Sequence, residues 1–161
     1  MADDLLLQTC DAIKTAIQSV DWGVSFDLER GYLDIDADLE QLDRLRVDVA
    51  VPEEWDEHNL DTIADEAYVV TIEVAIRKRF GLEQQNQSAG GVRKSEIDKL
   101  VNLASSMARY FTADRLNALD TANVSWKSMQ LAQLYSRKQL AESRQFTAIL
   151  EFTFEISTPR T

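Results

Sequence analysis

The sequence is poor in residues that build covalent or metal-bound scaffolds: its 161 residues include one cysteine, one histidine and two prolines. A single cysteine excludes an internal disulfide framework and is typical of a reducing compartment. A single histidine excludes the paired imidazoles that zinc motifs place at helical spacing. Long apolar runs are missing, and the first residues (M-A-D-D-L-L-L) are acidic where a signal peptide is basic. We therefore expect neither a membrane span nor export.

The common enzyme motifs are also missing. The chain has no G-x-G-x-x-G, no phosphate-binding G-x-x-x-x-G-K-[ST] and no G-x-S-x-G. A nuclease would place Glu and Lys two apart on one strand face, whereas Lys78 follows Glu73 by five residues, on the opposite face. His58 is expected in an exposed loop, and Cys10 lies on an apolar helix stripe, where a buried structural thiol is expected. We expect no enzymatic activity and no cofactor.

One acidic run resembles the start of a calcium loop. Asp34, Asp36 and Asp38 supply the D-x-D-x-D spacing. A calcium loop also requires glycine at its sixth position and a bidentate carboxylate at its twelfth, and these positions are Leu39 and Leu45. The sequence therefore predicts a solvated acidic loop and no metal site.

Alternating apolar and polar residues predict strands that each have one buried face. The pattern is clearest from Gln145 to Ser157, where Phe, Ala, Leu and Ile fall on one side and Thr and Glu mostly on the other. Tyr68–Phe80 alternates in the same way, and Arg46–Val51 and Val124–Leu131 are shorter examples. Alternating strands without intervening crossover helices favour antiparallel pairing.

Apolar residues at steps of three and four predict two main helices. One runs from Asp3 to Val20 and ends near Gly23, and the other opens at Ser95 with a capping-box-like spacing. The polar segment 81–93 is expected to form a long flexible loop or arm. The chain is thus predicted to be a single domain (residues 1–161) of the α+β class. In this domain, two main helices cover one face of an antiparallel or mixed sheet.

Charge is distributed unevenly along the chain, whose formal net charge is −11. Residues 1–66 contain 19 Asp and Glu against four Lys and Arg, whereas residues 67–161 contain nine acids against 13 bases. The simplest interpretation is a solvated acidic surface that favours solubility. The alternative is a molecule with poles of opposite sign that associates head to tail. Either way, so acidic a protein is a poor general ligand for nucleic acid.

Short charged segments are the candidate contact surfaces between copies. The basic candidates close one predicted strand or precede the last, with Arg77 and Arg79 expected on the solvent face: Arg77, Lys78, Arg79, Arg137, Lys138 and Arg144. They are either ordinary charges at strand ends or a basic edge that meets the acidic segment 34–65 of a neighbour. The candidates in that segment are Asp34, Asp36, Asp38 and Trp55, a tryptophan among acids that is suited to anchor an interface.

Three stretches that together span most of the chain carry a resemblance to a known family. Residues 26–51 lead from aromatic and acidic residues into a first core strand (F-D-L-E-R-G-Y-L…R-L-R-V-D-V-A-V). Residues 68–80 form a long central strand with a basic end (Y-V-V-T-I-E-V-A-I-R-K-R-F), and residues 135–156 a basic loop with a closing strand. In these features the chain resembles the tail terminator (neck) proteins of long-tailed bacteriophages.

The resemblance implies an α+β structural protein that closes into a homohexameric ring. Such a ring caps the tail tube, stops its polymerisation and docks to the head–tail connector or stopper protein. DNA passes through the bore without specific binding. The protein would be assembled in the host cytoplasm and reside in the virion neck, with no cofactor and no membrane. Head-to-tail contacts close into a ring when their rotation closes.

Two other functions remain open at this point. One is a different head–tail component, namely a stopper or a tail completion protein. The other is an acidic DNA mimic that inhibits DNA-binding enzymes of the host, which the low isoelectric point permits. A ring former should show a multiple of the protomer mass, whereas a mimic should displace DNA from a basic partner.

Overall fold

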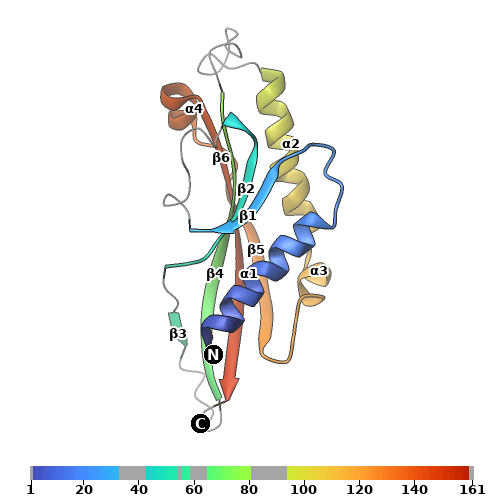
Figure 1. The fold of residues 1–161 in the computed structure, drawn as a ribbon, viewed down its shortest axis with the longest axis vertical. Helices are drawn as coiled ribbons and strands as arrows, with labels where there is room; N and C mark the ends of the chain where they lie inside the picture. Colours follow the sequence, from blue (N-terminus) through green and yellow to red (C-terminus); the bar gives the residue numbers. More distant parts are fainter. Residues whose placement is uncertain (1, 33–42, 54–55, 59–64, 81–93, 160–161) are drawn as a thin grey trace.

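The structure is a computed structural model and describes residues 2–32, 43–53, 56–58, 65–80 and 94–159 (Figure 1). These residues form four helices and six strands. The helices are α1 (Ala2–Gln18), α2 (Lys94–Tyr110), α3 (Ala113–Asn117) and α4 (Arg137–Ser143). The strands are β1 (Asp27–Gly31), β2 (Arg46–Ala50), β3 (Asp56–His58), β4 (Asp65–Arg79), β5 (Val124–Gln133) and β6 (Gln145–Pro159).

All six strands belong to one mixed sheet of order β1-β2-β4-β6-β5, with β3 added to β4. The two long strands β4 and β6 pair antiparallel over their full 15 residues, from Asp65 opposite Pro159 to Arg79 opposite Gln145. The β2–β4, β3–β4 and β5–β6 pairs are also antiparallel, and only β1–β2 is parallel among the described strands. The predicted α+β class is confirmed.

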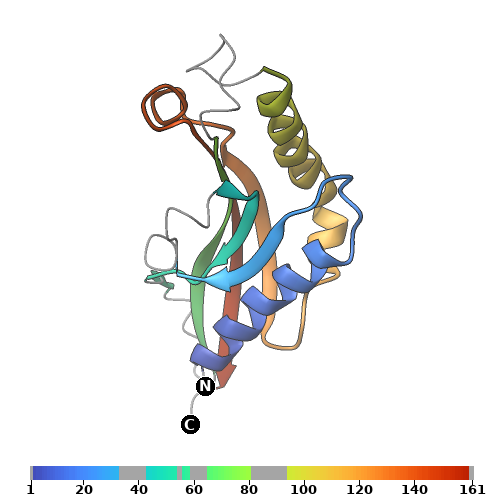
Figure 2. The same cartoon turned by 45° about the horizontal axis from the view of Figure 1, so that its top comes forward.

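The main core lies between one face of this sheet and helices α1 and α2, which lie on the same side of it in Figure 2. The strands supply the apolar residues that the alternation predicted, and the helices supply stripes at steps of three and four. The largest fully buried side chains are Phe146, Phe152, Phe154, Ile13, Ile17, Ile72, Ile76, Met107, Leu150, Ile156, Val47 and Val49. The two-helix cover that the sequence predicted is therefore present.

Several element boundaries differ from the expected ones. Helix α2 begins at Lys94, so Ser95 lies inside its first turn and is not its N-cap. Strand β3 contains His58, which was expected in an exposed loop, because the residues of β3 pair with Ala67–Val69 of β4. A long-range pairing of this kind overrides the weak local strand preference of acidic residues. Segment 81–93, predicted to be a flexible arm, lies outside the described residues.

The turn after α1 is built around Gly23, although α1 ends at Gln18, earlier than expected. Gly23 has φ +79°, a left-handed conformation that residues with a Cβ rarely adopt. Its N–H donates to Oδ1 of Asp21 at 2.9 Å, and Nε1 of Trp22 donates to the carbonyl oxygen of Ile17 at 2.9 Å. These bonds fix the path of the chain from α1 to β1. None of the described helices is long and apolar enough to cross a membrane.

Candidate interaction surfaces

Two basic segments that are far apart in the sequence come together at one end of the sheet. Antiparallel pairing places Arg79 at the end of β4 opposite Gln145 at the start of β6, and the Phe80 N–H donates to the Arg144 carbonyl oxygen at 2.8 Å. Helix α4 directly precedes β6 and lies at this same end, at the top of Figure 1. We call this surface the basic end, made of Lys78, Arg79, Arg137, Lys138 and Arg144.

Within the basic end, Arg137 and Lys138 are the most available cations. Both are exposed, and neither forms an ion pair with another residue in the described part of the chain. They occupy the first turn of α4, which contains no acid and is capped by Ser136, whose Oγ accepts from the Gln139 N–H at 3.2 Å. Positive charge near a helix N-terminus opposes the helix dipole. Their position therefore does not stabilise α4 and is compatible with a role outside the protomer.

The other members of the basic end have contacts within the protomer. Nη2 of Arg79 lies 2.9 Å from Oδ1 of Asp43, in a pair whose side chains are 32% and 56% exposed. Nζ of Lys78 lies 5.5 Å from the centre of the Phe80 ring, a cation–π distance. Arg144 is half-buried and takes the left-handed position that ends α4, with φ 51°. An exposed ion pair such as Arg79–Asp43 contributes little stability, so it does not prevent Arg79 from contacting a partner.

Arg77 does not lie on a solvent face, contrary to the expectation from the sequence. Its residue is only 6% exposed, and Asp48, Ala75 and Thr147 on the same face of the sheet are buried too. Strand alternation assigned these residues correctly to the face opposite the main core, but the prediction that this whole face is wet was wrong. Arg77 is therefore not available as part of an exposed basic edge.

A buried ionic cluster explains how Arg77 is held. Arg46 and Arg77 stand directly opposite each other on β2 and β4, where like charges repel. Asp48 lies between them and accepts from Nε of Arg46 at 2.7 Å and from Nη2 of Arg77 at 2.8 Å. Arg46 also reaches Oε2 of the exposed Glu29 at 3.3 Å. One buried carboxylate thus bridges two buried guanidinium groups.

Stretches of the sequence that are rich in acids lie at the opposite end of the described part of the molecule, which we call the acidic end. The first residues of α1 include Asp3 and Asp4, and Figures 1 and 2 show the start of α1 beside the start of β4 and the end of β6. Strand β3 (D-E-H) pairs near the start of β4, which itself begins with Asp65 and Glu66. The stretches 2–4, 56–58 and 65–67 contain no Lys or Arg. With a rise of about 3.3 Å per residue, this acidic end lies roughly 45 Å along β4 from the basic end.

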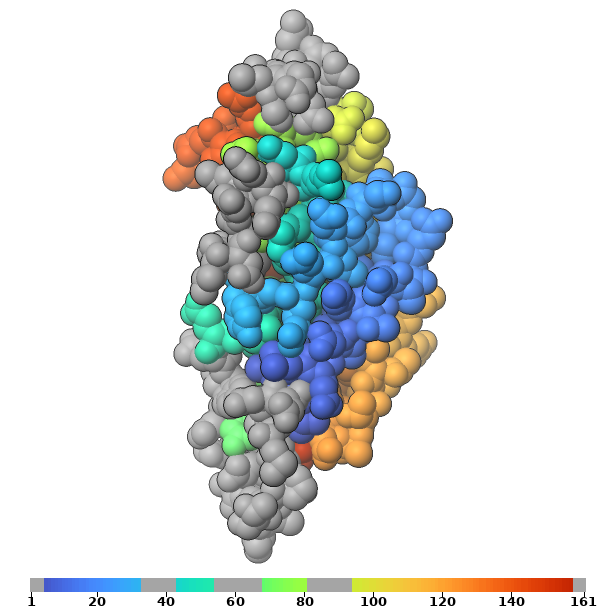
Figure 3. All heavy atoms as spheres, in the orientation of Figure 1, coloured from blue at the N-terminus to red at the C-terminus, as the bar shows by residue number. Residues whose placement is uncertain are grey.

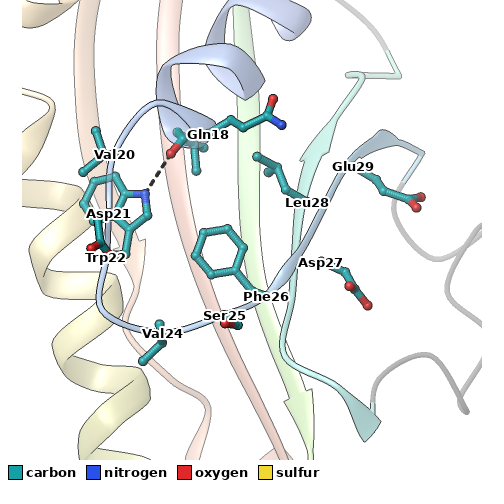
Figure 4. A pocket seen from close by; sticks show the side chains of 11 residues that line it. Gln18, Val20, Asp21, Trp22, Val24, Ser25, Phe26, Asp27, Leu28 and Glu29 are labelled. Atoms are coloured by element: carbon teal, nitrogen blue, oxygen red, sulfur yellow. Dashed lines mark hydrogen bonds between the residues drawn. The ribbon is translucent and has the colours of Figure 1, made fainter.

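A groove lies between the last turn of α1 and strand β1, with a volume of about 480 Å³. Its apolar lining includes Val20, Trp22, Val24, Phe26 and Leu28, all half-buried. Figure 4 shows Phe26 pointing into the groove, with Trp22 on the side of α1 and the carboxylates of Asp27 and Glu29 on the outer side of β1. In Figure 3, α1 and the following segment (dark to light blue) cover this side of the molecule.

The remaining sequence candidates give no catalytic or metal site in the described residues. Cys10 is fully buried on α1, and burial raises the pKa of its thiol to about 12, which makes it a poor nucleophile. His58 belongs to β3, but its side chain lies outside the described part. No group of three or more His, Cys, Asp or Glu among the described residues is placed to hold a metal ion. Asp34, Asp36, Asp38 and Trp55 lie outside the described residues.

The groove and the ionic cluster were not found from the sequence. The sequence did contain a sign of the cluster, because Asp48 is a charged residue within an apolar strand. In the antiparallel β2–β4 register, Asp48 lies next to the Arg46–Arg77 pair. The groove depends on where α1 lies against β1, which no local pattern determines. No protein-family model matches the chain, and no curated protein is significantly similar to it.

Proposed function

We propose that this protein is a structural subunit that acts by joining copies of itself into a ring, and that the ring is a phage tail terminator. The observation that supports self-assembly is the separation of charge: exposed Arg137 and Lys138 lie at one end of the sheet, and an acidic end lies roughly 45 Å away. Opposite poles on one molecule attract each other between copies and set their register. Such head-to-tail contacts close into a ring at a suitable rotation.

The sheet edges support the same proposal. The described sheet ends in β1 on one side and β5 on the other. An edge strand offers backbone N–H and C=O groups that another chain can pair with. In β5 the register shifts between Trp126 and Ser128 and between Leu131 and Gln133, and such bulges restrict pairing to a matching partner. A β5 edge that is protected in this way suits specific assembly more than aggregation.

The tail terminator assignment adds partners to this assembly. The ring would bind the end of the tail tube on one side and the head–tail connector or stopper on the other, in the neck of the virion. DNA would pass through the bore without being bound, because acidic residues that line it would repel phosphates. This part of the proposal is supported by the resemblance in residues 26–51, 68–80 and 135–156.

The test is negative-stain electron microscopy of the purified protein, alone and mixed with tail tubes of the same phage. We expect rings in the first sample and rings at tube ends in the second. Rings that bind connectors but not tubes would point to a stopper. A monomer that displaces DNA from a basic host protein, and forms no rings with or without tubes, would contradict the proposal and favour the DNA mimic.

A further inference from the structure

The groove between α1 and β1 combines apolar and polar lining residues. The side chains from Asp21 to Leu28 alternate between exposed and half-buried, so apolar residues line the groove and polar ones surround it. Trp22 is held by its hydrogen bond to the Ile17 carbonyl oxygen and by an edge-on contact with Tyr110, with ring centres 5.2 Å apart. A partner that enters would therefore meet a preformed surface, and preformed surfaces reduce the entropic cost of binding.

The electrostatic field in this groove favours a cation. The last turn of α1, of which Ile17 and Gln18 line the groove, contains no basic residue. Three carboxylates (Asp21, Asp27 and Glu29) line the groove together with Gln18 and Ser25, and none of the described lining residues is Lys or Arg. Glu29 forms an ion pair with Arg46, and Asp21 accepts a hydrogen bond from the Gly23 N–H. Asp27, by contrast, is exposed and forms no ion pair in the described part of the chain. An apolar floor with a negative border matches a segment that presents cations beside apolar side chains.

One described surface of the protomer has this complementary composition. Residues 134–138 lead into α4 and place half-buried Leu134 and Tyr135 next to exposed Arg137 and Lys138. We call these residues the basic corner. Among the described basic residues without an ion pair, Arg137 and Lys138 are the only two that are adjacent in sequence.

We propose that the α1–β1 groove receives the basic corner of a second copy of this chain. The inference rests on the proposed ring and gives Arg137 and Lys138 a more specific partner than the acidic end, namely the groove of the neighbouring protomer. The groove lies beside α1 and β1 and the basic corner lies at the α4 end, so one protomer presents both surfaces in different places (Figures 1 and 4). A contact between two different patches is head-to-tail, which is the type that forms rings. The Arg and Lys stems can lie on Trp22 and Phe26 while their charges extend past the edge strand β1 to Asp27, whose carboxylate lies on the outer side of that strand.

A charge-swap series tests the contact in the full-length chain. Asp27→Lys and Lys138→Glu should each weaken self-association about fivefold, because each replaces an attractive pair by a repulsive one. The double variant should return to within about twofold of the wild type, since its charges are exchanged and not lost. Lys99→Glu, at an exposed base on α2 that belongs to neither surface and to neither sheet edge, is the matched control and should leave association unchanged. The measurement is sedimentation velocity over a concentration series.

Disulfide trapping is a second test of the contact, and it does not require stable rings. Asp27→Cys and Lys138→Cys protomers are mixed at high concentration and oxidised, with an Asp27→Cys and Lys99→Cys mixture as the control. The native Cys10 is fully buried and does not compete. We expect a covalent dimer in the 27/138 mixture several times faster than in the control mixture.

The outcomes separate this contact from the proposed function. Rings that persist in both single charge variants, with no faster trapping in the 27/138 mixture, would overturn the groove contact and leave the ring proposal standing. A wild type that forms no rings but traps rapidly at 27/138 would contradict the ring and support the contact. Absence of both rings and trapping would overturn both.

Discussion

The buried ionic cluster gives the sharpest prediction about stability. Asp48 is 3% exposed and bridges Arg46 and Arg77 at 2.7 and 2.8 Å. Asp48→Ala removes the carboxylate that bridges the two buried guanidinium groups, and Arg77 then loses its counter-charge while Arg46 keeps Glu29; this costs about 3–5 kcal/mol of unfolding free energy. For a chain of this length, that loss lowers the melting temperature by about 6–20 °C. The assay is urea denaturation followed by tryptophan fluorescence, with the m-value checked for constancy.

Two matched variants make this prediction specific. Asp43→Ala breaks the exposed pair with Arg79 and should cost no more than about 1 kcal/mol. Replacing the whole cluster (Arg46→Met, Asp48→Leu and Arg77→Met) should restore most of the loss, because no buried charge is then left unpaired. An Asp48→Ala loss equal to that of Asp43→Ala would refute the reasoning. Equal instability of Asp48→Ala and the triple variant would do the same.

Three further changes have expected outcomes. Phe152→Ala should cost about 3–5 kcal/mol by urea denaturation, because Phe152 is fully buried and packs edge-on against Phe111; a loss below about 1 kcal/mol would mean that this face is not core. Gly23→Ala should lower the free energy of unfolding by about 1–2 kcal/mol, measured by thermal unfolding. The whole loss would come from the positive φ, since a Cβ at this position meets nothing within 4 Å. An unchanged melting temperature would argue against the left-handed turn at Gly23. The folded Cys10 thiol has a pKa raised to about 12 from 9.0, so its contribution to stability is complete below pH 9.0 and is lost as pH rises toward 12. The difference in unfolding free energy between the wild type and Cys10→Ala should therefore narrow from about pH 8 to about pH 10, and a constant difference would contradict the burial of the thiol.

The fold could be predicted from the sequence where a regular apolar pattern matches a single buried face. Alternation in 145–157 and 68–80 predicted which side chains of β6 and β4 face the main core, and the stripe with Cys10 predicted the buried face of α1. Such a pattern arises when one face of a helix or strand is buried and the other faces solvent. A local pattern cannot show that the opposite face of a strand is covered as well. For this reason Arg77, which lies on that face of β4, was wrongly expected to be exposed to solvent.

Long-range arrangement was the part that no local pattern determined. The parallel β1–β2 pair, the β3 pairing and the groove beside α1 each depend on which distant segments meet. The basic end illustrates the intermediate case. Both of its segments were visible in the sequence, but the β4–β6 register that joins them became clear only from the pairing of Arg79 with Gln145.

The central claim is that the protein acts by joining copies of itself, and its mass in solution tests this most directly. We expect sedimentation equilibrium to show a mass that rises with concentration toward six copies of the 18.3 kDa protomer, about 110 kDa. We also expect the transition to move to higher protein concentration as salt increases, because exposed charges are screened. A mass of 18.3 kDa at every concentration, in low and high salt alike, would contradict the account.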